Sequence, residues 1–345
     1  MHDNHFTTEH YFKLGLQSSF KNVGKYRKIV DKFQHIDTYK LKYDTSKWTF
    51  KCYNRTIFEK IREHYGINSN IYMESLCNEN MIMGKTYPKS GAKFWKTSNN
   101  KYIIKTITKS ECKFLRSILK KYSNYIQNND TYITKIFGMY RIVLPHLDYR
   151  FIIMNNIFEH SLKMDNIFDL KGTTEERFTK NEEQEVELKD MNFIERKFSF
   201  TFDEDDYNKF LSTIRNDSTF LKNLNIMDYS LLVGVLKYKK LEDVPKNLLN
   251  HHNVKINISE IEIKLYIFGI IDILQEWTLW KKCCRIYKKC YYHICCCNCL
   301  IEIDSEKPCI YHKRFIHFIT RNTNLSSFNK KQSSSEVLFD IDLNV

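Results

Sequence analysis

The chain has 345 residues and is 42% hydrophobic, so it can form the core of one large two-lobed domain or of two smaller domains. Its net charge of +13 predicts an acidic partner, and nucleic acid, an anionic membrane and phosphorylated small molecules all fit that description. No stretch approaches the ~18 apolar residues of a membrane-spanning helix. The chain shows no apolar leader, and its 11 cysteines are an odd number, which is typical of a reducing compartment. We therefore expect a cytoplasmic protein, either in solution or on a membrane surface.

The first half of the sequence passes from helical to strand patterns. Residues 1–84 carry aromatic-rich helical patterns such as TIFEKIREHYGI, whereas residues 86–107 have the pattern of strands. Within the strand region, SNN (98–100) separates AKFWKT from KYIIKTI as the loop of a hairpin would. The next segment, KSECKFLRSILKKY, predicts a helix because its apolar residues have helical spacing. These residues are Cys112, Leu115, Ile118 and Leu119.

The second half contains one apolar strand pattern, one charged stretch and one long helical pattern. RFIIMNNIF is typical of a short strand, and we expect the later stretch TEERFTKNEEQEVELKD to be exposed. DEDDYNKFLSTIRNDSTFLKNL predicts a helix whose acidic start suits the positive end of the helix dipole. Beyond Arg321, SSFNKKQSSSEV has the composition of a disordered tail.

Lys105 breaks the pattern of its predicted strand, because it shares one face with Ile103 and Ile107. It is either an edge residue whose stem covers apolar surface or a cation directed into a cleft. Glu111 lies on the inward face of the following helix, and a strand lysine paired with a helix glutamate occurs in kinase-like ATP sites. Thr108 and Glu111 also fit a capping box, in which the glutamate only accepts a backbone N–H. Both roles stay open for Glu111.

The segment PKSGAKFW precedes this strand, where a phosphate-covering loop of such a site would lie. It has a single glycine rather than the three of the protein kinase loop. Ser90 and Gly91 could form the turn, and Lys89 or Lys93 could approach phosphates. Alone, the segment is only a weak indication.

Two acidic residues stand at the boundaries of apolar strands. Asp228 in NLNIMDYSLLVGV has apolar residues on both sides, and Asp272 directly follows the apolar run of YIFGIIDIL. A lone acid at such a position is more often a turn residue or a helix cap. A pair of them can serve phosphoryl transfer, one orienting the attacking hydroxyl and the other holding Mg²⁺.

The order of several segments resembles the phosphatidylinositol phosphate kinases, which phosphorylate the inositol ring of phosphatidylinositol phosphates. These segments are SGAKF with YIIKTI, MNNIF, FDLKGTTEERF, LKDMNFIE, FLKNLNIMDYSLLVGV, FGIIDILQEW and IYHKRFIHFI. HYFKLGLQSSF resembles the start of the same domain, so the resemblance covers residues 10–322. DLKG, IMDYSLL and GIIDILQ in that order are its most specific part.

For ATP, the resemblance implies that Lys105 binds the phosphates, with Glu111 as its candidate partner, and that MNNIF near Met154 lies beside the adenine. The implied phosphate-binding loop consists of Ser90, Gly91, Ala92, Lys93 and Phe94.

For the chemical step, the resemblance implies that Asp228 is the catalytic aspartate that engages the attacking hydroxyl. Asp272 corresponds to the aspartate that binds Mg²⁺, and Asp169 and Lys171 of DLKG belong to the same catalytic region.

We therefore predict an α+β, kinase-like fold with two lobes, an antiparallel sheet in each, and the ATP cleft between them. Residues 1–155 would form the N-terminal lobe, 156–322 the C-terminal lobe with the activation segment, and 323–345 a disordered tail. The predicted activity is Mg²⁺-dependent transfer of the ATP γ-phosphate to a phosphatidylinositol monophosphate, with the 4-phosphate converted to the 4,5-bisphosphate. The alternative is a catalytically weak scaffold that binds phosphoinositides.

The resemblance also places the activation segment, which contacts the membrane, between Gln275 and Ile310. Its basic and aromatic residues suit an anionic membrane on the cytoplasmic side, with the plasma membrane as the first expectation. A homodimer is implied as well, and no motif for nucleic acid is present. A cysteine cluster departs from the family pattern, and a mobile loop, S-acylation and a zinc site are its three interpretations. The cluster consists of Cys283, Cys284, Cys290, Cys295, Cys296, Cys297 and Cys299.

Overall fold

The structure of the chain is a computed structural model. It describes residues 8–21, 35–43, 46–78, 81–83, 91–159, 162–180, 186–249, 251, 253–259, 262–278, 283 and 306–326. The chain divides into two compact units: unit 1 comprises residues 1–129 and 134–162, and unit 2 comprises residues 130–133 and 163–345. Each unit is built on its own sheet, antiparallel in unit 1 and mainly antiparallel in unit 2, with helices packed against it. The predicted α+β class with antiparallel sheets is confirmed.

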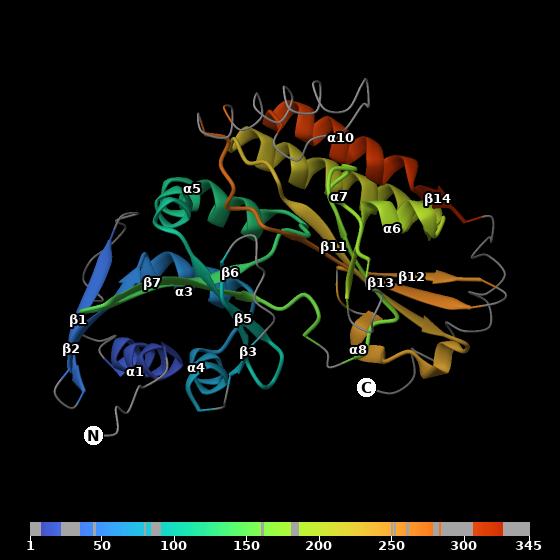
Figure 1. Cartoon of the computed structure of the whole chain (residues 1–345). Coiled ribbons are helices and arrows are strands. Elements are labelled where there is room, and N and C mark those ends of the chain that lie inside the picture. The colour runs from blue at the N-terminus through green and yellow to red at the C-terminus, as the bar shows by residue number, and fades with distance from the viewer. Residues whose placement is uncertain are drawn as a thin grey trace. The chain divides into compact units, whose positions relative to one another are not determined.

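Unit 1 contains a seven-stranded antiparallel sheet in the order β1-β2-β6-β7-β5-β4-β3. Its strands are β1 (Ile36–Tyr43), β2 (Ser46–Tyr53), β3 (Ile82–Met83), β4 (Phe94–Lys96), β5 (Tyr102–Ile107), β6 (Ile136–Leu144) and β7 (Leu147–Asn155). The helices are α1 (Thr8–Lys21), α3 (Arg55–His64), α4 (Ser69–Cys77) and α5 (Lys109–Asn128). Figure 1 shows α1 and α4 on one side of this sheet and α5 on the other.

The local predictions around Lys105 are confirmed. β4 and β5 form the expected hairpin, in which Phe94 lies opposite Lys105. Tyr102 and Ile104 turn their side chains into the core, while Lys105 lies on the other, half-buried face of the strand. α5 buries the apolar positions named from its spacing, including Leu115 and Leu119. The helical pattern assigned to residues 1–84 was wrong for β1 and β2, which form a hairpin.

Unit 2 contains a five-stranded sheet in the order β12-β13-β11-β8-β9, antiparallel except between β8 and β9. Its strands are β8 (Asn166–Leu170), β9 (Glu187–Lys189), β11 (Ser230–Tyr238), β12 (Val254–Ile258) and β13 (Ile263–Ile271). Two short strands, β10 (Phe200–Phe202) and β14 (Thr323–Leu325), pair in parallel. The helices are α6 (Asp190–Glu195), α7 (Glu204–Asn223), the 3₁₀ helix η1 (Leu241–Asp243), α8 (Lys246–Leu249) and α10 (Pro308–Arg321).

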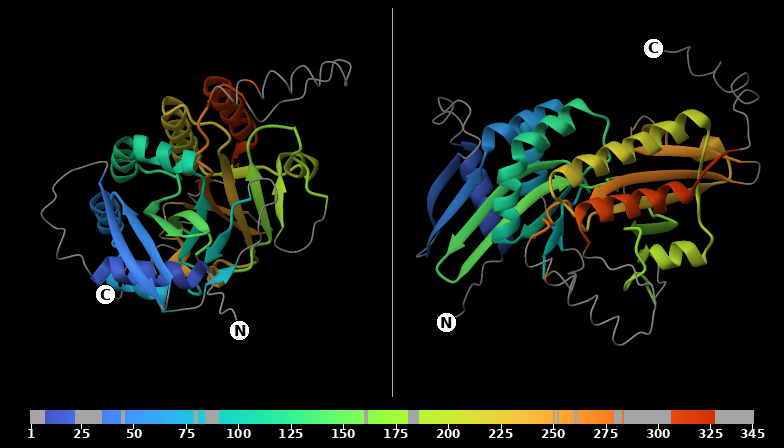
Figure 2. Two further views of the ribbon diagram at one scale, coloured as in Figure 1. Left: turned by 60° about the vertical axis from the view of Figure 1, so that its left-hand side comes forward. Right: turned by 90° about the horizontal axis from the view of Figure 1, so that it is seen from above.

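The two long helices of unit 2 lie side by side over its sheet, as both Figure 1 and Figure 2 show. α7 begins as predicted, because the side chain of Asp203 caps it by accepting a hydrogen bond from the backbone of Asp206. Phe210 of α7 packs with Phe200 of β10 and Phe268 of β13 in a core of aromatic rings in mutual contact. This packing fixes one face of the sheet and, with it, the ends of its strands.

Two sequence predictions need correction in unit 2. The charged stretch after DLKG is not simply exposed, since Glu175 and Arg177 are only 4% and 5% exposed. The disordered tail expected from residue 323 was wrong for its first residues, because Thr323–Leu325 forms β14. Residues 327–345 lie outside the described part of the chain.

Candidate active site

Three strand ends of unit 2 meet at one edge of the sheet. β11 lies between β8 and β13 and is antiparallel to both, with Leu231 opposite Leu170 and Ser230 opposite Ile271. The carboxyl ends of β8 and β13 therefore lie beside the start of β11. This register brings Lys171, which follows β8, to the same edge as Asp228 and Asp272. The sequence showed that the candidate residues lie at the ends of strands, but it did not show how those strands pair with one another.

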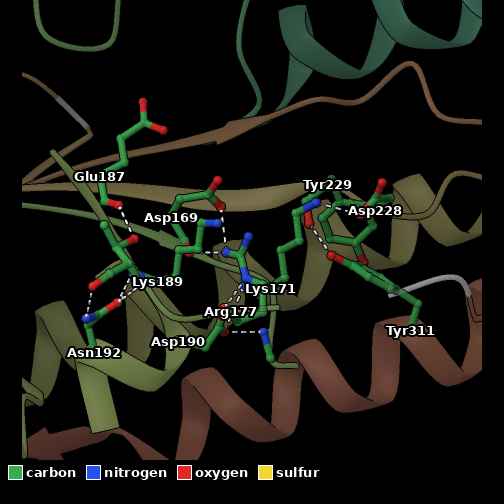
Figure 3. Close-up of polar contacts among 12 residues, drawn as sticks. Asp169, Lys171, Arg177, Glu187, Lys189, Asp190, Asn192, Asp228, Tyr229 and Tyr311 are labelled. Atoms are coloured by element: carbon green, nitrogen blue, oxygen red, sulfur yellow. Dashed lines mark hydrogen bonds and ion pairs between the residues drawn. The ribbon is translucent and has the colours of Figure 1, made fainter. Parts of the chain in front are cut away.

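Lys171 and Asp228 form an ion pair at this edge. The Lys171 Nζ lies 2.5 Å from Oδ1 of Asp228, and the two side chains are 13% and 24% exposed. Figure 3 shows the lysine side chain extended toward the aspartate. A charge-assisted hydrogen bond in a half-buried setting orients both groups and leaves the second carboxylate oxygen for a further partner.

The predicted catalytic aspartate and the predicted Mg²⁺ ligand both have an unusual backbone. Asp228 has φ 65° and Asp272 has φ 60°, in the left-handed region that residues other than glycine seldom adopt. Such conformations persist only where surrounding contacts impose them, and they are concentrated at functional sites.

The chain segments that carry these two aspartates are tied to each other. The Met227 N–H donates to the carbonyl of Gln275 at 3.0 Å, and the Trp277 N–H donates to the carbonyl of Asn225 at 2.9 Å. The Asn225 side chain in turn donates to the carbonyl of Trp277 at 3.0 Å. The backbone before Asp228 and the backbone after Asp272 are thus held as one piece.

A buried ion network lies behind Lys171, and the sequence reasoning missed it. Arg177 donates from Nε to Asp190 at 2.7 Å and from Nη2 to the carboxylate of Asp169 at 3.0 Å. It also donates to the backbone carbonyl of Asp169. The other carboxylate oxygen of Asp190 accepts the backbone N–H groups of Lys171 at 3.0 Å and Gly172 at 2.7 Å. These contacts are drawn in Figure 3.

The ionisation of this network follows from burial and charge together. Burial raises the pKa of the Asp169 carboxyl, but the charges of Arg177 and Lys171 outweigh it and hold that pKa below its usual range. Burial lowers the pKa of Arg177, but Asp169 and Asp190 outweigh it and raise that pKa. For Asp190, which is fully buried, burial raises the pKa in spite of Arg177. Asp169 is therefore an anion held by two cations.

Helix α10 supports both sides of the ion pair. The Tyr311 hydroxyl donates to the backbone carbonyl of Tyr229, the residue after Asp228, and the two rings lie 4.8 Å apart. On the lysine side, Gly172 has φ 70° and lies so close to α10 that a Cβ atom there would be 3.2 Å from the Cα of Phe315. The glycine of DLKG is thus required both by its backbone angle and by the nearby helix.

In unit 1, the structure brings part of the predicted phosphate loop next to Lys105. Its ammonium lies 5.2 Å from the ring centre of Phe94, in a cation–π contact. Lys93 is held by its backbone N–H, which donates to the Thr106 hydroxyl at 2.8 Å, and by its ammonium, 3.2 Å from the Tyr149 hydroxyl. Gly91 is exposed with φ 61° and Ala92 is half-buried. Ser90 lies outside the described residues.

Glu111 and Met154 occupy defined positions in the same unit. Glu111 completes a capping box at the start of α5, where its carboxylate accepts the Thr108 N–H at 2.7 Å. The capping role foreseen for Glu111 is therefore present in the structure. Met154 lies half-buried on β7, opposite Ile103 of β5 and Ile136 of β6.

Most of the region predicted to contact the membrane lies outside the described residues. Of the seven-cysteine cluster, only Cys283 is described, and it is exposed. In the part of the chain that the structure does describe, no helix is both long and apolar enough to cross a bilayer. Within those same ranges, His, Cys, Asp and Glu side chains do not gather in groups of three or more as metal ligands would.

Comparison with known proteins shows the family. The family model described as Phosphatidylinositol-4-phosphate 5-Kinase matches residues 75–260 and 239–322. The chain belongs to the phosphatidylinositol phosphate kinase family, which confirms the resemblance seen in the motifs.

Individual relatives have both ring specificities in their names. Phosphatidylinositol 5-phosphate 4-kinase type-2 alpha of Gallus gallus is 29% identical, over 79% of this chain and 78% of the relative. Human phosphatidylinositol 4-phosphate 5-kinase type-1 beta is 29% identical, over 78% of this chain and 57% of the relative. The phosphatidylinositol 4-phosphate 5-kinase of Plasmodium falciparum (isolate 3D7) is 30% identical, over 84% of this chain and 19% of the relative.

Proposed function

We propose that the chain transfers the γ-phosphoryl group of ATP to the inositol ring of a phosphatidylinositol monophosphate. The observation that carries this proposal is the meeting of Lys171, Asp228 and Asp272 at one sheet edge. Phosphoryl transfer requires positioning and neutralisation of charge more than covalent chemistry by the protein. A carboxylate fixed by a cation, with a second carboxylate at the neighbouring strand end, supplies both requirements.

Asp228 is the group that engages the attacking inositol hydroxyl in this proposal. One of its oxygens is held by Lys171, and its backbone lies in the left-handed region. The other oxygen can accept the hydroxyl hydrogen as the inositol oxygen bonds to the γ-phosphorus and the bond from that phosphorus to the departing ADP breaks. Lys171 holds one oxygen of Asp228 in place and adds positive charge close to where negative charge develops.

Mg²⁺ suits the donor set at this edge. Mg²⁺ in kinases is usually held by one or two carboxylates together with substrate phosphates, rather than by a full set of protein ligands. Asp272 provides one exposed carboxylate, on a backbone fixed in the left-handed region. When bound, the ion would neutralise phosphate charge. The part of Asp272 in this scheme is to offer an oxygen ligand at a fixed strand end.

The proposed ATP contacts come from unit 1. Lys105 would bind the phosphates, with the backbone of Gly91 to Phe94 as the covering loop, and Met154 would lie beside the adenine. The contact of Lys105 with the Phe94 ring supports this assignment, because it places the loop and the lysine together. Glu111 acts first as a helix cap, and its pairing with Lys105 stays a proposal.

For the lipid, we propose phosphatidylinositol 4-phosphate as substrate and the 4,5-bisphosphate as product. Relatives named for this reaction and for the 5-phosphate reaction match at similar identity, so the choice between them needs a direct assay. The net charge of +13 supports a peripheral position on an anionic membrane at the cytoplasmic side, the plasma membrane first. A homodimer is part of the same proposal.

The test is lipid phosphorylation with purified full-length chain, Mg²⁺ and radiolabelled ATP. Separate phosphatidylcholine vesicles carry the 3-, 4- or 5-monophosphate, and the products are separated by ring position. We expect a labelled bisphosphate from the 4-phosphate, lowered by about 10²–10⁴-fold in Asp228→Asn and abolished in Asp272→Asn. Asp206→Asn is the matched control, because it breaks another ion pair of unit 2, with Lys255 at 2.8 Å.

The outcomes separate the two functional hypotheses. Product from one isomer, lost in both catalytic variants and retained in Asp206→Asn, supports the kinase and identifies its substrate. Vesicle binding by a folded chain that yields no product from any isomer would instead favour the phosphoinositide-binding scaffold.

A further inference from the structure

The turn that follows β8 binds the carboxylate of Asp190 through its backbone. The N–H groups of Lys171 and Gly172 both donate to one oxygen of Asp190, at 3.0 and 2.7 Å. Two successive N–H groups can point the same way here because Gly172 adopts φ 70°. Such a concave pair of N–H groups is a favourable anion site. The carboxylate therefore fixes the peptide units from which the Lys171 side chain starts.

Arg177 closes the other side of this turn. Its fork joins the second oxygen of Asp190 to both the carbonyl and the carboxylate of Asp169. The Arg177 backbone takes part as well, because its carbonyl accepts the N–H of Met191 at 3.0 Å. A planar guanidinium in two such contacts holds the relative orientation of its partners. Arg177 thus connects Asp169, near the end of β8, to Asp190 at the start of α6.

The contacts of Arg177 and Asp190 with the turn after β8 determine the position of Lys171 more than they determine the position of Asp228. A lysine has a long, flexible stem, so its ammonium is placed only if its backbone is fixed. Asp228 has a short side chain and is held by its own backbone and by the contact between Tyr311 and Tyr229. The 2.5 Å approach of the two charged groups therefore requires a fixed turn at 171–172.

We propose that Arg177 and Asp190 are positioning residues that set the Lys171 ammonium against the Asp228 carboxylate. The inference rests on the proposed function, in which Lys171 and Asp228 form part of the catalytic centre. Neither Arg177 nor Asp190 touches the reacting atoms in this scheme, since both act through the turn that carries Lys171. A simple structural role would stabilise unit 2 without any specific link to Lys171.

A double-mutant cycle tests the link. The variants are Asp190→Asn, Lys171→Met and their combination, assayed as full-length chains on vesicles that contain both the 4- and the 5-monophosphate. Asp190→Asn keeps the shape of the side chain but turns an amide donor toward Arg177. We expect kcat to fall about 100-fold, as misplacement of a catalytic group does, with KM for ATP unchanged. In the Lys171→Met background the same substitution should cause no further loss.

Arg177 supplies a second, milder variant that keeps the test valid if Asp190→Asn fails to fold. Arg177→Lys retains the charge but loses the fork, and Arg177→Met loses both. The kcat should decrease from the wild type to Arg177→Lys and again to Arg177→Met. In the Lys171→Met background, neither substitution at Arg177 should lower kcat further. Asp206→Asn again serves as the control, because it breaks a separate ion pair of unit 2 and should leave kcat unchanged.

A readout that needs no activity separates this inference from the proposed function. Amide hydrogen exchange can be measured by NMR. It should be slow at Lys171 and Gly172 in the wild type and faster in Asp190→Asn and Arg177→Lys. If a chain without kinase activity shows this change, the proposed function fails and the positioning stands. Unchanged exchange at both amides, or equal losses of kcat in both Lys171 backgrounds, would overturn the positioning.

Discussion

Gly172 lies directly against the backbone of Arg314 on α10. A Cβ atom at Gly172 would be 3.1 Å from the Arg314 carbonyl oxygen, closer than side chains normally approach backbone atoms. The same glycine has φ 70° and donates its N–H to Asp190. One residue thus joins the turn of the candidate site to the helix that also supports Tyr229.

We expect Gly172→Ala to destabilise unit 2 by about 3 kcal/mol, through left-handed strain and through overpacking against α10. Gly66→Ala is the matched control, since Gly66 has φ 65° and no atom within 4 Å of the added Cβ. It should cost only the strain, about 1 kcal/mol. Urea unfolding of both variants measures the difference. Equal losses of unfolding free energy in the two variants would show that α10 accommodates the added Cβ atom without cost.

The sequence predicted those parts of the site that local patterns carry. Lys105 interrupts an alternating strand, and Asp228 and Asp272 interrupt apolar runs, so each was identified as a candidate without knowledge of the tertiary fold. The hairpin of β4 and β5 and the helices α5 and α7 were predicted on the same basis. Such signals are local because burial periodicity acts over a few residues.

Arg177 and Asp190 could not be found in this way. They lie in a stretch rich in charge, and charge in sequence normally indicates exposure. Their burial depends on partners that only the tertiary fold brings together, on β8 and α6. The strand β1, in contrast, did carry a signal, because TYKLKY alternates apolar and charged residues as a half-buried strand does.

Buried thiols should make the protein sensitive to alkaline pH. Burial raises the pKa of Cys52 to about 11, whereas in the unfolded chain a cysteine ionises near pH 8.5. Because the folded state holds the proton more tightly, stability is complete below about pH 8.5 and falls as pH rises toward 11. At pH 10 the loss from this thiol is about 2 kcal/mol.

The measurement is urea unfolding at several pH values between 7 and 10 for wild type and Cys52→Ala. The variant is less stable at pH 7 because of the cavity, but its stability should depend less steeply on pH. Parallel curves of stability against pH for wild type and Cys52→Ala would contradict the assignment of the alkaline loss to Cys52.

The reactivity of the thiols should follow their exposure. Cys283 is exposed and should react with iodoacetamide under native conditions, whereas buried Cys52 should not.

Asn225 should be needed for the alignment of the two strand ends that carry Asp228 and Asp272. It has φ 62°, and its side chain donates to the carbonyl of Trp277. Asn225→Gly keeps the backbone angle at no strain but loses the hydrogen bond, whereas Asn225→Ala also introduces strain of about 1 kcal/mol. We expect both variants to lower kcat, and the unfolding midpoint to fall further in Asn225→Ala than in Asn225→Gly, because only Asn225→Ala adds strain to the lost hydrogen bond. Vesicle assays and urea curves on the pair decide this, and full activity in Asn225→Gly would remove the side chain from the alignment.

Tyr311 should link the stability of α10 to the activity of Asp228. Its hydroxyl donates to the buried carbonyl of Tyr229, so Tyr311→Phe leaves that carbonyl without this donor and should cost about 1 kcal/mol. Because the lost contact is one residue from Asp228, kcat should fall as well. Tyr122→Phe is the control in unit 1, where the hydroxyl donates to the carbonyl of Thr134 at 2.7 Å and also accepts the N–H of Ile136 at 2.8 Å. It should lower stability by more, because two hydrogen bonds are lost, but leave kcat unchanged. A Tyr311→Phe variant that loses stability and keeps its kcat would restrict Tyr311 to a structural role.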